Sequence, residues 1–235
     1  MPPKKPTETT SEAVEQLDVA FKNLSTKTTF KHEIKYLMVG EANFSFAKAL
    51  TSKHPEITGK LVATEYRDEA AARAEYGDKY TSHSKLLAER KVKQQMSVDA
   101  MHLEAHFPDT RIKRIYFNGP NDGTHWKESP KGVKNLLKNF FQSAEKVQSE
   151  GDKVYLGLPK PDPRPSNYPG GAPLNMDTYY QAFRYYLYDA SVAAGYRLVA
   201  KHHLSDTDRY PEYEHVTTNN SHFEHDAADT FRQYV

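Results

Sequence analysis

Short apolar runs alternate with amphipathic stretches along most of this chain. Residues 35–39 (KYLMV) and 60–64 (KLVAT) have the length and apolar character of buried strands, and a helical stretch follows each. Similar runs predict strands at 95–98, 112–117, 153–158 and 196–203, and a weaker one around 214–218. This alternation predicts an α/β fold with a mostly parallel sheet and helices on both faces.

The clearest predicted helix covers residues 133–147. Its apolar side chains fall on one face at helical spacing, and they are Val133, Leu136, Leu137, Phe140, Phe141, Ala144 and Val147. Pro130 suits the first turn of this helix, and Gly151 suits the exit from it. Less regular patterns predict helices at 44–52, 69–75, 81–93 and 176–190.

The N-terminal part of the chain has a different character. The polar residues 1–10 (MPPKKPTETT) predict a disordered tail. Residues 11–30 predict a helical arm, in which Val14, Leu17, Phe21 and Leu24 lie on one side of a helix at 12–24. The rest, 31–235, is long enough to form one domain with a substantial core.

Composition excludes several kinds of chemistry. The chain has no cysteine, which excludes disulfides, cysteine-ligated zinc and a thiolate nucleophile. No apolar run approaches the roughly 18–20 residues that span a bilayer, so we expect no membrane segment. The net charge of +1 is small for a protein that grips a long nucleic acid. We therefore expect local basic clusters, such as Lys131, Lys134 and Lys138, to be solvated faces.

Polar residues or a glycine stand at four of the predicted strand ends, namely Gly40, Glu65, Asp99 and Asn118. Ligands of open α/β sheets bind beyond the carboxyl ends of the strands. Gly40 permits a tight turn, Glu65 can accept both hydroxyls of a ribose, and Asp99 can accept from an adenine amino group. Alone, each residue is typical of a turn or a solvated surface. Together they predict an adenosine pocket with a reaction loop at Asn118.

The residue at position 42 narrows the choice of cofactor. A dinucleotide site would show a fuller G-x-G-x-x-G pattern after the first strand. Here Ala42 stands at the second glycine position, which argues against a bound pyrophosphate. S-adenosylmethionine carries no phosphate, so this pattern favours S-adenosylmethionine.

Several segments also occur in an order that is typical of one family. They are VGEANFSFAKAL, VATEY, VDAMHL, IYFNGPNDG, LLKNFFQSA and YPEYEHVTT. From about Lys35 to Thr218 the chain resembles the eukaryotic rRNA uridine-N(3) methyltransferase-like family. The resemblance implies a Rossmann-like class I methyltransferase domain at 31–235 with a seven-stranded sheet. It also implies S-adenosylmethionine as cofactor, methylation of a ring nitrogen of a uridine in rRNA, and a nuclear or nucleolar location, with the cytoplasm as the alternative.

The resemblance also assigns site residues by position. Cofactor-binding roles fall on Gly40, Glu41, Ala42, Asn43, Phe44, Ser45, Asp99 and Asn118. Glu65 stands where the family often has serine, so its ribose role rests on its place at a strand end. Catalytic roles fall on Asn118, Pro120 and Asn121.

Three positions depart from the family pattern. Ala42 replaces a glycine, Gly119 replaces a phenylalanine, and Asn121 replaces a histidine. The last two lie where the target base is expected. Two alternatives therefore stay open: a methyltransferase that acts on a small molecule or protein, and an inactive binding protein with the same fold.

Other candidate residues are less specific. Trp126 and Tyr168 are candidates to stack on a target base, and Asp122 or His125 to take its proton. The proline-rich segment 159–173 is either a substrate lid or an ordered connection. The late histidines, such as His222 and His225, lack a third ligand at convincing spacing, so we expect no metal.

Overall fold

The computed structural model describes residues 29–121, 130–159, 186–203, 210, 212–214 and 231–234. The chain divides into two units, Met1–Phe30 and Lys31–Val235, and every described helix and strand belongs to the second unit. The predicted tail and the predicted helix at 12–24 lie outside the described residues.

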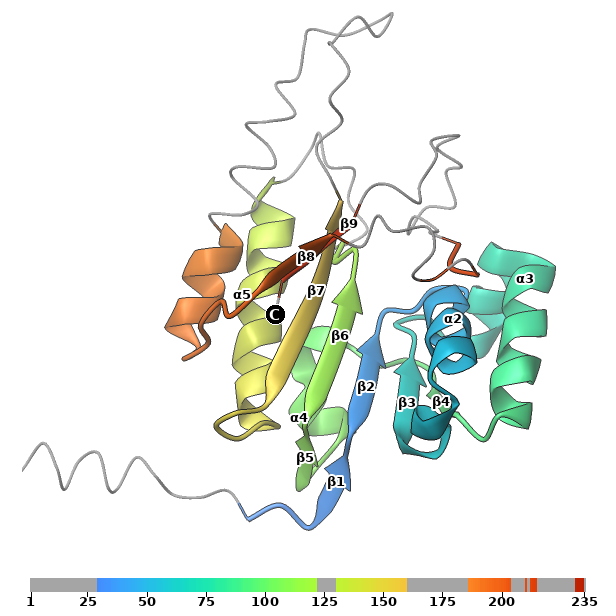
Figure 1. Ribbon diagram of the computed structural model, residues 1–235. Helices are drawn as coiled ribbons and strands as arrows, with labels where there is room; N and C mark the ends of the chain where they lie inside the picture. The colour runs from blue at the N-terminus through green and yellow to red at the C-terminus, as the bar shows by residue number, and fades with distance from the viewer. Residues whose placement is uncertain are drawn as a thin grey trace, which may run out of the picture. The chain divides into compact units, whose positions relative to one another are not determined.

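A seven-stranded sheet organises the second unit (Figure 1). Its spatial order is β4 (Lys93–Gln95), β3 (Leu61–Thr64), β2 (Tyr36–Val39), β6 (Arg114–Asn118), β7 (Lys153–Pro159), β9 (Phe231–Tyr234) and β8 (Lys201–His203). The first five strands are parallel, and β9 is antiparallel to both of its neighbours. The chain moves outward from β2 in one direction and from β6 in the other. The strand order therefore reverses between the adjacent strands β2 and β6, which is the place where such sheets bind ligands.

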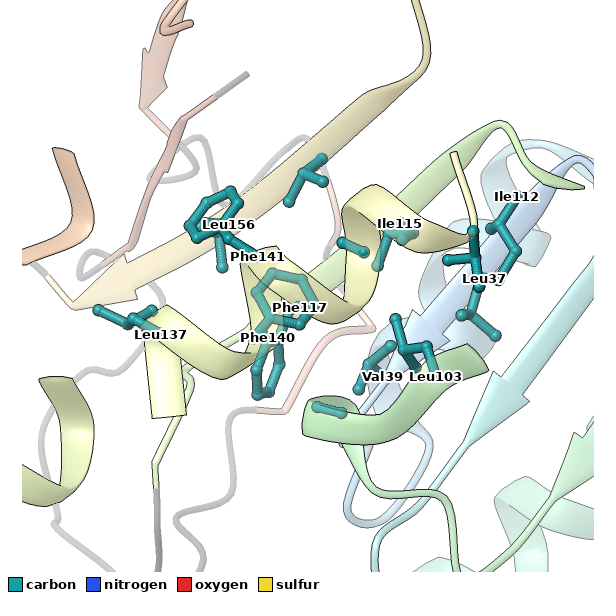
Figure 2. Packing of buried hydrophobic residues seen from close by; sticks show 14 of the residues in the cluster. Leu37, Val39, Leu103, Ile112, Ile115, Phe117, Leu137, Phe140, Phe141 and Leu156 are labelled. Atoms are coloured by element: carbon teal, nitrogen blue, oxygen red, sulfur yellow. The ribbon is translucent and has the colours of Figure 1, made fainter. Parts of the chain in front are cut away.

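One face of the sheet packs against α5 (Pro130–Lys146), α4 (Leu103–His106) and the short 3-10 helix η2 (Ala100–His102). Figure 2 shows Phe117 and Leu156 of the sheet beside Phe140 and Phe141 of α5. The rings of Phe117 and Phe140 lie 5.0 Å apart, close to edge-to-face. Leu187 and Ala190, from the helical residues 186–193, belong to the same cluster.

The other face packs against α2 (Ser45–Lys53) and α3 (Glu69–Glu89). Met38 and Ala63 point to this side, whereas their neighbours Leu37 and Val62 point to the first side. This alternation is the pattern expected of strands buried on both faces. The predicted mostly parallel seven-stranded α/β sheet with helices on both faces is therefore confirmed.

Several element boundaries differ from the prediction. The run 112–117 is not one strand: β5 (Thr110–Ile112) pairs with β1 (His32–Ile34) in a separate two-stranded sheet, and β6 starts at Arg114. The change of partner lies at Lys113, whose N–H donates to the carbonyl of Ile34 on β1, whereas its carbonyl accepts from the N–H of Lys153 on β7. Apolar content identified the run but could not reveal which partner each half pairs with.

Three further predictions are shifted. The third strand covers Lys93–Gln95 and not 95–98, because Ser97 has a φ of 58° that interrupts an extended backbone. Within 196–203 only Lys201–His203 is a strand. The helices predicted at 69–75 and 81–93 are one element, α3, with a non-helical Gly77 inside it.

Candidate functional site

The turn after β2 requires glycine at position 40. Gly40 has a φ of 65°, and a Cβ on it would lie 3.2 Å from Cε2 of Phe117 on the adjacent strand β6. A side chain would therefore be strained by the backbone and crowded by the neighbouring ring. The main chain at Gly40 thus lies directly beside the carboxyl end of β6.

The rest of loop 40–45 alternates between ordinary and left-handed backbone. Ala42 has a φ of 52° and Phe44 has a φ of 62°, although neither residue is glycine. Phe44 is fully buried, and the centre of its ring lies 5.6 Å from that of Tyr80. It is the residue immediately before α2. Burial of this ring fixes the point where the loop turns into α2.

The polar side chains of the loop point inward. Asn43 is 1% exposed, and its Oδ1 accepts from the N–H of Ser45 at 3.0 Å. The carbonyl of Asn43 accepts from Nδ1 of buried His83 on α3 at 2.9 Å. The hydroxyl of Ser45 donates to the carbonyl of Glu214 at 2.5 Å. These side chains hold the loop in shape, and they leave its outer surface to the main chain.

Glu41 is also turned into the protein. Its Oε2 accepts from the N–H of Ala47 in the first turn of α2 at 2.8 Å. Burial of this carboxyl, with a further contribution from the negative charge of Glu65, raises its pKa to about 8, while the hydrogen bond from Ala47 opposes the shift. Glu41 therefore occupies the amide end of α2 that would otherwise suit an anion.

Glu65 joins the loop to the end of β3. It is 2% exposed, and its Oε2 accepts from the N–H of Ala42 at 2.8 Å. The backbone N–H of Val98 donates to the carbonyl of Glu65 at 3.0 Å, which brings the segment leading to Asp99 beside it. The ends of β2, β3 and β4 thus meet at Glu65.

Asp99 lies at the start of η2. Its Oδ1 accepts from the N–H of Met101 at 2.8 Å, and its own N–H donates to Nε2 of His106 at 3.0 Å. The side chain is partly exposed. A carboxylate oxygen has two lone pairs, so Asp99 retains capacity to accept from an amino group.

Asn118 ends β6 and has the most unusual environment of the predicted site residues. Its Oδ1 and Nδ2 are buried, and neither has a hydrogen-bond partner among the described residues. Gly157 on β7 faces it, and a Cβ there would lie 2.5 Å from that Oδ1, so glycine at 157 leaves the space that the amide occupies. An unpaired buried amide costs about 1–3 kcal/mol, so it indicates an absent partner.

The rest of the predicted reaction loop follows directly. Gly119 has a φ of 62°, and its N–H donates to the carbonyl of Gly157 at 2.8 Å. Pro120 is buried and Asn121 is exposed. Gly119 therefore replaces the family's phenylalanine at a position whose backbone favours glycine.

Some supporting residues were not predicted from the sequence. Arg67, His83 and His106 contact predicted site residues, and Tyr76 contacts Arg67. Nothing in the spacing of these four residues distinguishes them from surface or core residues. Tyr213 does belong to a family segment, YPEYE, and its ring lies 5.2 Å from that of Phe46 on α2. The family motif was therefore the sequence feature that could have pointed to Tyr213.

Several candidates lie outside the described residues: Asp122, His125, Trp126, Tyr168, the segment 160–173, His222 and His225. Within the described ranges, no group of three or more His, Cys, Asp or Glu side chains is placed to hold a metal ion. None of the helices described combines the length and apolar content that crossing a bilayer requires.

A family model described as BMT5-like, rRNA (uridine-N3-)-methyltransferase, matches residues 37–217, which is most of the chain. The chain is also 34% identical over 128 residues to the mouse (Mus musculus) ferredoxin-fold anticodon-binding domain-containing protein 1 homolog. That match covers 53% of this chain and 20% of the mouse protein, so this chain spans only about a fifth of its relative's length.

Solved structures with detectable likeness include the 16S rRNA methyltransferase KamB, at 15% identity and a TM-score of 0.45, covering 92% of both chains. They also include the pyocyanin biosynthetic protein PhzM, at 10% identity and a TM-score of 0.47, covering 88% of this chain and 50% of that one. At these values the fold assignment rests on the strand order described above.

Proposed function

The chain belongs to the BMT5-like family of rRNA (uridine-N3-)-methyltransferases, and from this membership we propose that it transfers a methyl group from S-adenosylmethionine to a ring nitrogen of a uridine in rRNA. The family match covers residues 37–217 and therefore includes every strand end of the candidate site. Because the chain spans about a fifth of its mouse relative, the activity and substrate of the whole protein are part of this proposal.

The unpaired amide of Asn118 carries the proposal. It offers an NH2 donor group and a carbonyl acceptor where the strand order reverses, beside the Gly40 loop. Gly40, Glu65 and Asp99 lie at the neighbouring strand ends and supply a close backbone approach and two carboxylates. These backbone, amide and carboxylate groups fit the adenosine and amino-acid parts of S-adenosylmethionine. None of the groups needs a phosphate or a metal as its partner.

Each residue has a separate part in this proposed site. Glu65 would accept the two ribose hydroxyls, Asp99 the adenine amino group, and the main chain of loop 40–45 would line the amino-acid moiety. When bound, the cofactor supplies an activated methyl group on a positively charged sulfur. Alignment of the acceptor nitrogen with that methyl group then contributes much of the rate.

The chain's own contribution to the reaction centre is Asn118. Its amide, next to the buried Pro120, can bind a base edge or the cofactor without itself gaining or losing a proton. The uridine ring nitrogen must lose its proton, and the candidates for that step, Asp122 and His125, lie outside the described residues. The described part of the chain therefore accounts for binding and orientation.

Labelled methyl transfer tests the proposal. The purified chain is incubated with methyl-labelled S-adenosylmethionine and, separately, rRNA, protein and small-molecule fractions, and modified nucleosides are identified by mass spectrometry. We expect label in rRNA as N3-methyluridine. Label confined to protein or small molecules would favour the first alternative, and no transfer with retained cofactor binding would favour an inactive binding protein.

Asn118→Ala is the matching variant. We expect it to lower methyl transfer by at least about 100-fold, which is the size of effect that loss of one well-placed polar group has on a transition state. Calorimetry should show a much smaller loss of S-adenosylmethionine affinity, of about tenfold or less. Asn135→Ala, which alters an exposed asparagine on α5, is the control and should keep full activity. Undiminished transfer by Asn118→Ala would contradict the assignment.

The altered loop at Gly119 and Asn121 bears on the choice of target. Asn121 cannot stack on a base as an aromatic or a histidine does, so a different part of the chain must hold the uridine in place. We further propose that the protein works in the nucleolus, where its proposed substrate is made. Imaging of a tagged full-length protein tests this location.

A further inference from the structure

Arg67 is a charged residue that neither the strand-end pattern nor the family segments assign. It follows Glu65 by two positions, beyond the end of β3. Its guanidinium Nη1 lies 3.5 Å from Oε1 of Glu65, and its backbone N–H donates to the same oxygen at 3.3 Å. Arg67 thus contacts the carboxylate oxygen that the loop does not use.

A second contact, with Tyr76, holds the guanidinium of Arg67 in place. Nη1 of Arg67 donates to the hydroxyl of Tyr76 on α3 at 2.9 Å, and the guanidinium carbon lies 5.4 Å from the centre of that ring. Tyr76 is itself buried, and its pKa is raised to about 12 by burial and by the negative charge of Glu65. The tyrosine hydroxyl is therefore a neutral, fixed acceptor for Arg67.

The charges around Glu65 show why a cation is needed there. Glu41 and Glu65 are both buried, and the charge of Glu65 contributes to the raised pKa of Glu41. A buried carboxylate without a cation or hydrogen bonds takes up a proton or turns toward solvent. Arg67, with 23% of its side chain exposed, supplies the positive charge at this corner of the site.

We propose that Arg67 is a positioning residue that makes the site selective for a cofactor with an intact ribose diol, by holding the carboxyl group of Glu65 in one orientation. The inference rests on the proposed function, because it takes Glu65 to be the acceptor of the ribose hydroxyls. A carboxylate accepts hydrogen bonds at both oxygens, so its orientation decides whether it meets both ribose hydroxyls. Loss of Arg67 therefore weakens diol binding in particular.

Calorimetry with two ligands tests this role separately from catalysis. The ligands are S-adenosylhomocysteine and its 2′,3′-dideoxy analogue, which lacks the hydroxyls that Glu65 would accept. The variants are Arg67→Gln, which removes the charge, Arg67→Lys, which keeps it, and Tyr76→Phe, which removes only the anchoring hydroxyl. Arg73→Gln is the control, since Arg73 is an exposed arginine on α3 that pairs with Glu69.

For Arg67→Gln we expect S-adenosylhomocysteine to bind about tenfold more weakly, in line with loss of a charge-assisted interaction. Affinity for the dideoxy analogue should change by less than about twofold. Arg67→Lys should recover part of the loss, Tyr76→Phe should lose less than Arg67→Gln, and Arg73→Gln should match the unmutated chain.

Two results would overturn the inference in distinguishable ways. If the unmutated chain does not bind S-adenosylhomocysteine, the proposed function fails and the inference fails with it. If the unmutated chain binds, but Arg67→Gln binds both ligands as the unmutated chain does or loses affinity for both equally, the inference alone fails. Should Arg67→Gln not fold, the same comparison for Tyr76→Phe decides, because that variant removes a single hydroxyl.

Discussion

At the scale of single residues, loop 40–45 is held by two buried acidic side chains, Glu41 and Glu65. Ala42 adopts a left-handed backbone at a position where the family pattern has glycine, and Glu65 accepts from its N–H. Glu41 accepts from the N–H of Ala47 in the first turn of α2. The two side chains therefore bind loop and helix N–H groups from within the protein, and Glu41 takes up an N–H at the amino end of α2 that a phosphate would otherwise bind.

The buried Glu41 predicts a pH-dependent stability. Because its pKa is raised to about 8, the folded chain keeps a proton there that the unfolded chain releases at lower pH. The stabilising contribution is complete in acid and is lost as the pH rises toward about 8, by up to about 1.4 kcal/mol per pH unit. Glu41→Gln cannot ionise, so its stability relative to the unmutated chain should rise over this range.

Denaturant unfolding of both proteins between about pH 5 and about pH 8 measures this difference. Glu150→Gln, which alters an exposed carboxylate, is the control and should follow the unmutated chain. A difference between Glu41→Gln and the unmutated chain that does not vary with pH would show that Glu41 stays ionised in the folded state.

At the scale of elements, α3 is interrupted by a kink and still buries side chains along one face. Its buried residues, Ala72, Tyr76, Tyr80, His83 and Leu87, follow each other at spacings of three or four. Gly77 lies among them with a φ of 59° and a ψ of −139°, which is a conformation that side chains strongly disfavour. The kink allows Tyr76 to contact Arg67 while His83 contacts the loop.

Gly77→Ala tests the kink. A Cβ at this position would meet no atom within 4 Å, so its cost is conformational and not a clash. We expect a loss of about 1–2 kcal/mol in the free energy of unfolding, measured by urea denaturation. Gly59→Ala is the matched control, because that glycine is equally open and has no left-handed φ, and it should be neutral or slightly stabilising. Equal effects of the two substitutions would mean that α3 straightens at no cost.

At the scale of the whole molecule, the sheet brings the candidate site residues together, and the small net charge limits the electrostatic binding of RNA. The strand order reverses between the adjacent parallel strands β2 and β6, and this places Gly40 beside Phe117 and Asn118. The net charge is only +1, and described lysines such as Lys48, Lys79 and Lys146 lie near carboxylates. From this charge balance we expect weak electrostatic binding of RNA.

The salt dependence of RNA binding tests this balance of charge. For a single-stranded rRNA fragment we expect a shallow slope of log affinity against log salt, about −2 to −3, as for neutralisation of three or four phosphates. Filter binding over a series of salt concentrations measures the slope, and Lys85→Gln, on the exposed side of α3, should leave it unchanged. A slope steeper than about −6 would reveal an extensive basic surface.

The sequence by itself determined the family, the fold class and the strand ends that carry the site. Apolar runs of four or five residues, such as those ending at Val39 and Thr64, identify strands because a strand buried on both faces must be apolar throughout. The family prediction is confirmed by the match over 37–217. The predicted roles of Gly40, Glu65, Asp99 and Asn118 stay predictions, and the structure places these residues at adjoining strand ends.

Only the tertiary structure decided which residues support those groups and which run of chain pairs with which. The break at Lys113 and the short strands β1 and β9 depend on partners far away in the chain, and local patterns carry no information on these partners. Arg67, His83 and Gly157 gain their importance from contacts with Glu65, Asn43 and Asn118. Such contacts arise because packing brings distant residues within a few ångströms, whereas sequence periodicity reports only which face of an element is buried.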